Sequence, residues 1–296
     1  MKKTLNWFVR SMGRLAMSGL LLFGSGCAGS GQQVSPDVEP TGEKGSVAPD
    51  VSGKSFSGRE KAKGERLVQV AGESIRVNPQ DADAYVQRAK GYILQFEMDR
   101  AQADFEKALA INPRLVRAYT ERAEMYFIMG EDYKAIEDYS QAIKIDPKLM
   151  DAYFRRGTFY ENIGEPGKAL ADYSQVIQLN PNYAPGYFQR GYILHRRGEL
   201  ERALKDYNRA IALWPDVYTY YYQRGNVYYA QGQFKKAARD FEQTAKLDPR
   251  ASHYERAGRI HYRELNNKPK GCRLYRRACD LGDCLHTTRM ILKNQC

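Results

Sequence analysis

Five short stretches of the sequence share one pattern: YVQRA at 85–89, YTERA at 119–123, YFRRG at 153–157, YFQRG at 187–191 and YYQRG at 221–225. Each begins with tyrosine, carries arginine three residues later, and starts 34 residues after the stretch before it. Prolines keep the same spacing, at positions 79, 113, 147, 181, 215 and 249. Five consecutive copies in phase predict a chain built from stacked copies of one small unit.

Two further positions of the unit are filled consistently in all five copies. Sixteen residues after the tyrosine comes an alanine, and an aromatic residue follows four residues later: Ala101 and Phe105, Ala135 and Tyr139, Ala169 and Tyr173, Ala203 and Tyr207, Ala237 and Phe241. This pattern resembles the tetratricopeptide repeat, a helix-turn-helix unit of 34 residues. The resemblance implies an all-α fold, an α-solenoid of helical hairpins wound as a right-handed superhelix. It places five repeats at 80–251, a capping helix at 59–79, and a degenerate sixth repeat with a C-terminal cap at 252–296.

The repeated arginine occupies a place where this family usually has leucine. Sixteen residues after each arginine comes an aspartate, which gives five candidate pairs: Arg88 with Asp104, Arg122 with Asp138, Arg156 with Asp172, Arg190 with Asp206, and Arg224 with Asp240. A buried unpaired charge is costly, whereas guanidinium and carboxylate can meet through two parallel hydrogen bonds. We therefore predict one structural ion pair per repeat, within a hairpin or to the adjacent one, which sets helix register. The matched acids argue against the alternative, an arginine stripe that binds phosphate or nucleic acid.

The resemblance also indicates which surface binds partners, because the first helix of each hairpin lines the inner surface of such arrays. The inward positions here are mostly aromatic and include Phe127, Phe154, Phe188, Tyr192, Tyr222 and Tyr229. The chaperone-binding members of the family instead carry lysine, arginine and asparagine, which hold a peptide's terminal carboxylate. An aromatic surface suits an apolar helix or an extended segment of a partner protein. The alternative is that these rings only pack against neighbouring repeats or against the chain's own terminus.

The N-terminus has the order of an export signal: basic MKKTLNWFVRSMGR, apolar LAMSGLLLF, then small GSGC. The small residues ending in Cys27 resemble the lipobox of bacterial lipoproteins, which implies a signal peptide at 1–26 and lipidation of Cys27. Ala28 follows the cysteine where aspartate favours inner-membrane retention, so an outer membrane, facing the periplasm, is the expected location. An ordinary signal peptide cut near Ser25 and a retained N-terminal anchor are the alternatives. Residues 27–58 are small and polar, with Pro and Gly but no apolar periodicity, which predicts a disordered tether.

The C-terminal segment is basic and contains four of the five cysteines. Residues 250–296 hold eleven Lys and Arg against four acids, which suits anionic lipid headgroups, cell-wall polymer, an acidic protein, or merely a solvated cap. Its stretch CRLYRRACDLGDC also resembles Sel1-like repeats. If 272–280 and 285–293 form an antiparallel hairpin, Cys272 lies near Cys296 and Cys279 near Cys284, and we predict these two disulfides in an oxidising compartment. A metal site that includes His286 is the alternative, although the spacing fits no common zinc pattern.

Motifs of catalysis are missing from the sequence: it has no HExxH, no GxSxG and no glycine-rich phosphate loop after a strand. We therefore expect a protein that is not an enzyme and has no cofactor, metal or nucleic acid. The predicted function is a membrane-anchored adaptor that binds partner proteins in the bacterial cell envelope, with self-association left open. The alternatives are polyanion, cell-wall or lipid-headgroup binding through the basic end, and a pilotin-like assembly factor for an outer-membrane secretin.

Overall fold

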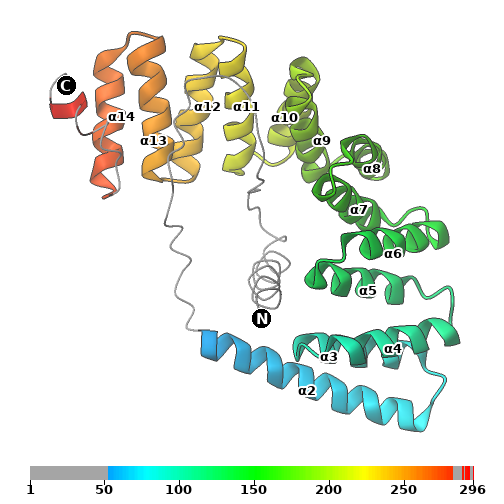
Figure 1. The fold of residues 1–296 in the computed structure, drawn as a ribbon. Coiled ribbons are helices and arrows are strands. Elements are labelled where there is room, and N and C mark those ends of the chain that lie inside the picture. The colour runs from blue at the N-terminus through cyan, green and yellow to red at the C-terminus, as the bar shows by residue number, and fades with distance from the viewer. Residues whose placement is uncertain (1–52, 283–288, 290, 294–295) are drawn as a thin grey trace. The chain divides into compact units, whose positions relative to one another are not determined.

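The protein is described here from a computed structural model, which covers residues 53–282, 289, 291–293 and 296. Throughout that part of the chain the regular structure is helical, without a strand, and the helices follow one another as antiparallel hairpins (Figure 1). The predicted signal peptide, Cys27, the tether up to residue 52, and Cys284 lie outside the described residues. The predicted all-α fold of repeated hairpins is confirmed.

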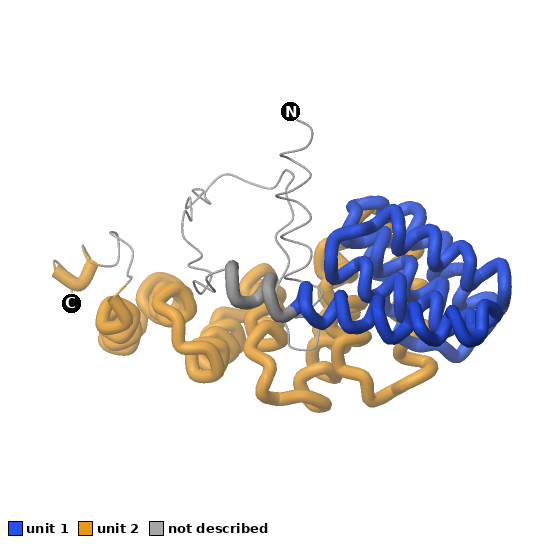
Figure 2. The backbone as a smooth tube through the Cα atoms, turned by 90° about the horizontal axis from the view of Figure 1, so that it is seen from below, with its two compact units in different colours: residues 1–159 blue, residues 160–296 orange. Residues whose placement is uncertain are grey.

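The helices before the boundary at residue 159 are α2 (Gly53–Val77), α3 (Ala82–Leu94), α4 (Met98–Ile111), α5 (Val116–Met129), α6 (Asp132–Ile145) and α7 (Met150–Asn162), which crosses it. Those after it are α8 (Pro166–Leu179), α9 (Ala184–Arg196), α10 (Leu200–Leu213), α11 (Tyr218–Ala230), α12 (Phe234–Leu247), α13 (Ala251–Arg259), the π-helical turn η1 (Ile260–Glu264) and α14 (Lys268–Asp280). The chain forms two compact units, unit 1 up to Phe159 and unit 2 from Tyr160 (Figure 2).

The core of each hairpin comes from the repeated small and aromatic positions. The alanine and aromatic residue of the second helix are fully buried in the outermost full repeats, at Ala101 and Phe105 and at Ala237 and Phe241. The opposing residue of the first helix must be small: a Cβ added to Gly191 would lie 3.1 Å from the Tyr207 ring. Burying one large ring contributes about 2–3 kcal/mol. The aromatic ring of the second helix, packed against a small residue of the first helix, therefore stabilises every hairpin.

The turn inside each hairpin needs a left-handed backbone, and glycine supplies it in four of the five repeats. Gly130, Gly164, Gly198 and Gly232 have φ between 69° and 78°. The first hairpin has Phe96 at the equivalent position, with φ 61° and a side chain that is 56% exposed. A non-glycine residue is strained there, so packing of the flanking helices outweighs the local preference of the chain.

The connection between hairpins is set by the Asn-Pro or Asp-Pro pair. The side chains of Asn112, Asp146 and Asn180 accept hydrogen bonds from the backbone N–H two residues later, at 2.9–3.0 Å. Each stands directly before a proline, which disfavours a helical conformation for that residue. The second helix therefore stops at the residue before the pair, and the chain turns into the next hairpin.

The N-terminal cap is a long helix that packs on the first full hairpin. Helix α2 begins at Gly53, inside the segment expected to be tether, rather than at residue 59. Its contact with α3 is close enough that a Cβ on Gly64 would lie 2.7 Å from the Gly91 carbonyl oxygen. Among the described residues, no helix combines the length and the apolar character needed to cross a bilayer.

The C-terminal end of unit 2 is a sixth hairpin made of α13, η1 and α14. Gly258 and Gly271 face each other across it: a side chain on Gly258 would clash with the Tyr275 ring, and one on Gly271 would clash with the Cβ and backbone nitrogen of Tyr262. The structure joins Cys272 to Cys296 by a disulfide, with Cα atoms 5.7 Å apart. Cys279 is also disulfide-bonded, and its predicted partner Cys284 lies outside the described residues.

Candidate functional site

The repeated arginines are engaged within the hairpins. Two nitrogens of each guanidinium, Nε and Nη2, donate to both oxygens of the aspartate 16 residues later, at 2.7–2.8 Å, for Arg88–Asp104, Arg122–Asp138, Arg190–Asp206 and Arg224–Asp240. These aspartates are buried. The hydrogen bond that each arginine donates to its aspartate raises the pKa of Arg88 and of Arg190. Arg156 and Asp172 belong to different units, so that pair stays a prediction.

Three of the repeated arginines also contact the preceding hairpin. In unit 2, Arg190 Nη1 donates to Ser174 at 3.4 Å and Arg224 Nη1 donates to Asn208 at 2.7 Å, while Arg156 donates to Ser140 at 3.0 Å in unit 1. Each guanidinium also lies 5.4–5.8 Å from the ring of the tyrosine three residues earlier. Arg190 and Arg224 thus each join three helices, which explains a charged residue at a position where the family usually has leucine.

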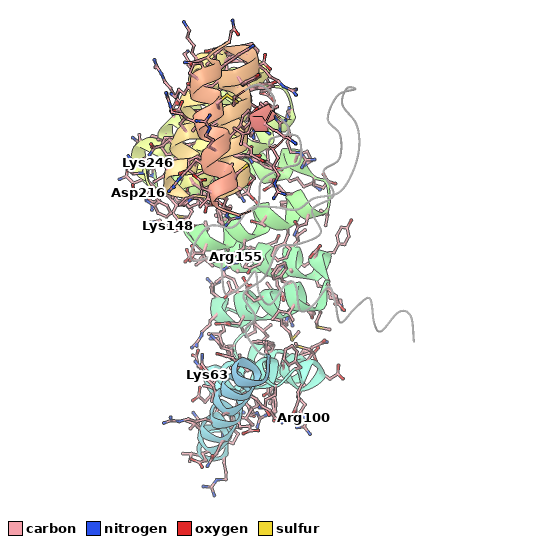
Figure 3. The ribbon with its side chains drawn as sticks, turned by 90° about the vertical axis from the view of Figure 1, so that its left-hand side faces the viewer. Lys63, Arg100, Lys148, Arg155, Asp216 and Lys246 are labelled. Atoms are coloured by element: carbon pink, nitrogen blue, oxygen red, sulfur yellow. A yellow bond between two sulfur atoms is a disulfide. The ribbon has the colours of Figure 1, made fainter. Side chains whose placement is uncertain are left out.

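In unit 1, charged pairs connect the first helices of successive hairpins. Lys90 contacts Glu121 at 2.6 Å, Glu124 contacts Arg155 at 3.4 Å, and Asp83 contacts Arg117 at 3.6 Å. Figure 3 labels Arg155 on α7. The predicted partner-binding residues Phe127 and Phe154 are both half-buried, and Phe127 packs edge-on against Phe159 at 5.4 Å. On the first-helix surface of unit 1, these charged side chains are therefore largely neutralised by partners on the neighbouring hairpin.

In unit 2, aromatic rings fill the corresponding positions. Phe188 lies 4.9 Å from Tyr220 and 5.9 Å from Tyr207, which wedges it between α10 and α11. Tyr222 lies edge-on to Phe241 at 5.6 Å, and Tyr192 is half-buried. Phe188 thus packs between repeats, as the alternative interpretation expects, while the contact of Tyr222 with Phe241 lies within one hairpin.

Tyr229 differs from the other predicted binding residues because it is exposed, at 38%. Its ring packs edge-on against Phe234 at 5.4 Å, and its hydroxyl donates to Glu264 at 3.2 Å. It therefore presents both an aromatic face and a polar tip at the surface of α11, which is the combination common at protein interfaces.

Sequence reasoning missed Arg256 as a member of this surface. The tyrosine spacing falls from 34 to 33 residues between Tyr221 and Tyr254, so the sixth hairpin is shifted by one residue. With that shift, Arg256 is equivalent to Gln223 and to Arg155. Its Nη2 donates to Asn226 at 2.7 Å, and its guanidinium lies over the rings of Phe241 and Tyr222 at 4.8 and 5.5 Å. The shortened tyrosine spacing, together with the position of Gly258, is the sequence feature that could have identified Arg256.

Buried polar groups differ between hairpins. The Tyr139 hydroxyl donates to Glu124, and the Tyr173 hydroxyl donates to Glu161 at 2.6 Å. Burial raises the pKa of Glu161 and lowers the pKa of His195. The equivalent Tyr207 hydroxyl is buried without a hydrogen-bond partner in the described part of the chain. Across the same residues, no three His, Cys, Asp or Glu side chains cluster in a way that could hold a metal ion.

Comparison with known families agrees with this architecture. Family models described as tetratricopeptide repeat or TPR repeat match residues 82–115, 123–164, 151–183, 173–205 and 191–260, together more than half of the chain. No curated protein matches the chain.

Solved structures of similar fold are repeat proteins of the same kind. The C-terminal part of a TPR repeat-containing protein from Cytophaga hutchinsonii aligns with TM-score 0.67 and 17% identity, over 79% of this chain and 97% of that one. YrrB, described as a TPR protein with an unusual peptide-binding site, aligns with TM-score 0.54 and 23% identity, over 62% and 94%. A tetratricopeptide repeat protein from Parabacteroides merdae aligns with TM-score 0.53 and 20% identity, over 81% and 95%. By its repeats, its fold and these family matches, the chain belongs to the tetratricopeptide repeat family.

Proposed function

We propose that this chain is a non-catalytic scaffold that binds partner proteins through the first helices of its hairpins, chiefly those of unit 2. The observation that carries the proposal is the row of aromatic side chains on α9 and α11, which ends in the exposed Tyr229. Aromatic rings supply large contact area at low entropic cost, so they dominate many protein interfaces. YrrB, a TPR protein of similar fold with an unusual peptide-binding site, supports a binding role for this kind of fold.

We further propose that the scaffold works at the bacterial cell envelope, held by a lipid on Cys27 at an outer membrane and facing the periplasm. The support is the order of basic, apolar and small residues that ends at Cys27. If the predicted tether between Cys27 and Gly53 is a flexible coil, it reaches about 30 Å, and the repeats would meet partners away from the bilayer. Recruitment or assembly of envelope proteins, including a pilotin-like role for a secretin, is the expected class of task.

The binding surface is tested by chemical crosslinking and pull-down from membranes with the full-length chain and two variants. One variant carries Phe154, Phe188 and Tyr222 replaced by alanine, and the other carries only Tyr229→Ser. We expect both to lose partner proteins that the natural chain retains. Tyr229→Ser is the cleaner variant, because an exposed side chain can be removed with little effect on folding.

The matched control is Tyr133→Ser on α6, which removes a ring that is 69% exposed from the second helix of a hairpin. Circular dichroism melting establishes that each variant folds. If the Tyr229→Ser and triple-alanine variants recover the same partners as the natural chain, the first-helix surface is not the binding surface.

Envelope anchoring is tested separately with Cys27→Ser. We expect the natural chain to incorporate radiolabelled palmitate and to sediment with membranes, whereas the variant does neither. A variant that still sediments with membranes would replace lipid anchoring by a retained N-terminal anchor or by association through another surface.

A second candidate function is polyanion binding by the basic end. Arg273 and Arg277 are exposed on α14, and neither has an ion-pair partner in the described part of the chain. Such binding depends on surface charge and therefore weakens steeply with salt, whereas capture through aromatic contacts survives moderate salt. Pull-down at about 0.05 and 0.5 M NaCl separates the two candidates, because 0.5 M salt shortens the Debye length to about 4 Å.

A further inference from the structure

One face of α13 and η1 carries three arginines in a row: Arg256, Arg259 and Arg263. Spacings of three and four residues keep them on one side of the helix. Arg259 and Arg263 are exposed and Arg256 is half-buried, while the intervening Ala257 and Ile260 are buried in the core of the hairpin. We call these three residues the arginine stripe.

The stripe has no matching acids, unlike the other arginines of the repeats. No carboxylate forms an ion pair with any of its three members within the described residues. Two acids lie near it: Glu264, whose carboxylate accepts the Tyr229 hydroxyl, and Glu255, which is buried on α13. Arg155, which occupies the place of Arg256 in an earlier repeat, is paired with Glu124, whereas Arg256 meets the neutral Asn226.

Arg256 is also incompletely satisfied. Its Nε is buried and has no hydrogen-bond partner in the described part of the chain, although Nη2 is bonded. The guanidinium lies against the rings of Phe241 and Tyr222, so its position is fixed before any ligand arrives. A preorganised cation on an apolar floor binds an anion more strongly than a mobile solvated one does.

The stripe is continuous with the aromatic surface of α11. Burial raises the pKa of Tyr229, Glu264 adds to that rise, and Arg256 and Arg259 lie close enough to oppose it. Burial also raises the pKa of Tyr275 on α14, and there Arg259 and Arg263 oppose the rise. The three arginines therefore extend from the tyrosines of α11 towards α14 as one strip of positive charge.

The dimensions of the stripe limit its ligand. Seven residues of helix separate its ends, which corresponds to about 10 Å along the axis. One carboxylate is too small to satisfy such a strip, but two acidic side chains can span much of it. Residues two positions apart on an extended strand face the same side about 7 Å apart, and residues three positions apart on a polyproline II segment do so about 9 Å apart. A flat bilayer surface would reach the exposed Arg259 and Arg263 more easily than the half-buried Arg256, which favours a protein segment over anionic lipid.

We propose that the arginine stripe, together with Tyr222 and Tyr229, binds an extended acidic segment of a partner protein that has two Asp or Glu residues two or three positions apart beside an apolar side chain. The acids pair with the guanidinium groups and the apolar side chain packs on the tyrosines. This inference rests on the proposed function and specifies the chemistry of the partner.

The test selects a phage-displayed library of random twelve-residue peptides on the full-length chain. We expect the enriched sequences to be acidic, with the predicted spacing and an adjacent apolar residue. Dissociation constants of the enriched peptides are then measured by fluorescence anisotropy for the natural chain and for Arg256→Gln/Arg259→Gln/Arg263→Gln. We expect at least about tenfold weaker binding by this variant, because losing one side of close charge pairs raises the dissociation rate.

The matched control removes three charges from another face of unit 2, as Lys235→Gln/Arg239→Gln/Lys246→Gln on α12. All three are exposed, and Figure 3 labels Lys246. We expect this control to bind within about twofold of the natural chain, because distant exposed charges are screened. Enrichment of neutral or basic peptides, or equal loss in both variants, would overturn the proposal.

Vesicles of phosphatidylglycerol and phosphatidylcholine provide the competing outcome. If such vesicles sediment the natural chain, release the stripe variant, and the library yields no acidic peptide, the stripe is a lipid site and the proposal fails. The proposed function is distinguished by the crosslinking experiment above. If Tyr229→Ser loses envelope partners while the stripe variant keeps them, the scaffold function stands and only the acidic-ligand inference is wrong.

Discussion

Units 1 and 2 use the same helical hairpin but fill its first-helix surface differently. In unit 1 that surface is crossed by charged pairs such as Lys90 with Glu121 and Glu124 with Arg155. In unit 2 it carries rings such as Phe188 and Tyr222, followed by arginines without acids. The Arg–Asp pairs inside the hairpins, in contrast, have the same geometry in both units. Positions between the two helices of a hairpin thus determine the fold, and positions on the first-helix surface are free to differ.

The largest expected effect comes from breaking the shared pair in each unit. Asp138→Asn in unit 1 and Asp240→Asn in unit 2 each leave a mostly buried guanidinium without its carboxylate. We expect each to lower the free energy of unfolding by about 2–3 kcal/mol, because removing one partner leaves an uncompensated charge. Urea unfolding followed by circular dichroism measures the loss.

The control for this pair of variants is Glu97→Gln, which breaks the exposed contact with Arg100 on α4 (Figure 3). An exposed ion pair contributes less than about 1 kcal/mol. Similar losses for Asp138→Asn and Asp240→Asn would support a common framework. A large loss in one unit and none in the other would show that the pairs do not have the same structural role.

Much of the framework could be predicted from the sequence because the repeat samples each position five times. The register of Arg122 with Asp138 indicated a contact that one repeat alone would not reveal. The strained turn at Phe96 could not be predicted, because no rule of local chain preference favours phenylalanine where glycine is usual. Arg256 was missed because a one-residue shift breaks the spacing on which the register depended.

The sequence also could not predict how deeply the aromatic residues are buried. Periodicity shows which side of a helix Phe188 is on, but it does not show how far the next hairpin covers the ring. That coverage depends on the size of partners such as Tyr207 and Tyr220 in other helices. Hence the predicted binding surface contained both packing residues and the exposed Tyr229.

A smaller effect is expected at the aromatic position of the second helix. Tyr139→Phe in unit 1 removes a hydroxyl that donates to Glu124, so we expect a loss of about 1–2 kcal/mol. Tyr207→Phe in unit 2 removes a buried hydroxyl that lacks a partner among the described residues, so we expect no loss, or a gain of up to about 1 kcal/mol. Thermal melting of both variants measures the contrast.

Equal destabilisation by the two Tyr→Phe changes would contradict this contrast. It would mean that the Tyr207 hydroxyl has a partner, such as a bound water, that replaces the carboxylate found in unit 1. The sequence already hints at the difference, because Tyr192 and His195 stand where the other two repeats place Glu124 and Glu161.

The smallest expected effect depends on pH and concerns the C-terminal hairpin of unit 2. Glu242 lies 2.7 Å from Lys270 and 2.6 Å from His261, and although burial alone would raise the pKa of Glu242, these hydrogen bonds lower it overall. A carboxyl with a lowered folded-state pKa stabilises the protein above its unfolded pKa of about 4.5, and this stabilisation is lost as the pH falls further. We expect Glu242→Gln to cost less than about 1 kcal/mol at pH 7, because the site is partly exposed.

The cost of Glu242→Gln should therefore shrink as the pH is lowered from 6 to 3, because the stabilisation is lost as the pH falls below the unfolded pKa towards the lowered folded-state pKa of Glu242. Urea unfolding at several pH values measures it, with Lys270→Met as the matched variant that removes one partner and keeps the carboxyl. A cost that stays constant over this range would mean that Glu242 contributes packing rather than charge. In that case the C-terminal hairpin would be held by its buried apolar core, its glycine contacts and its disulfide, and the electrostatic difference between the units would be confined to the first-helix surface.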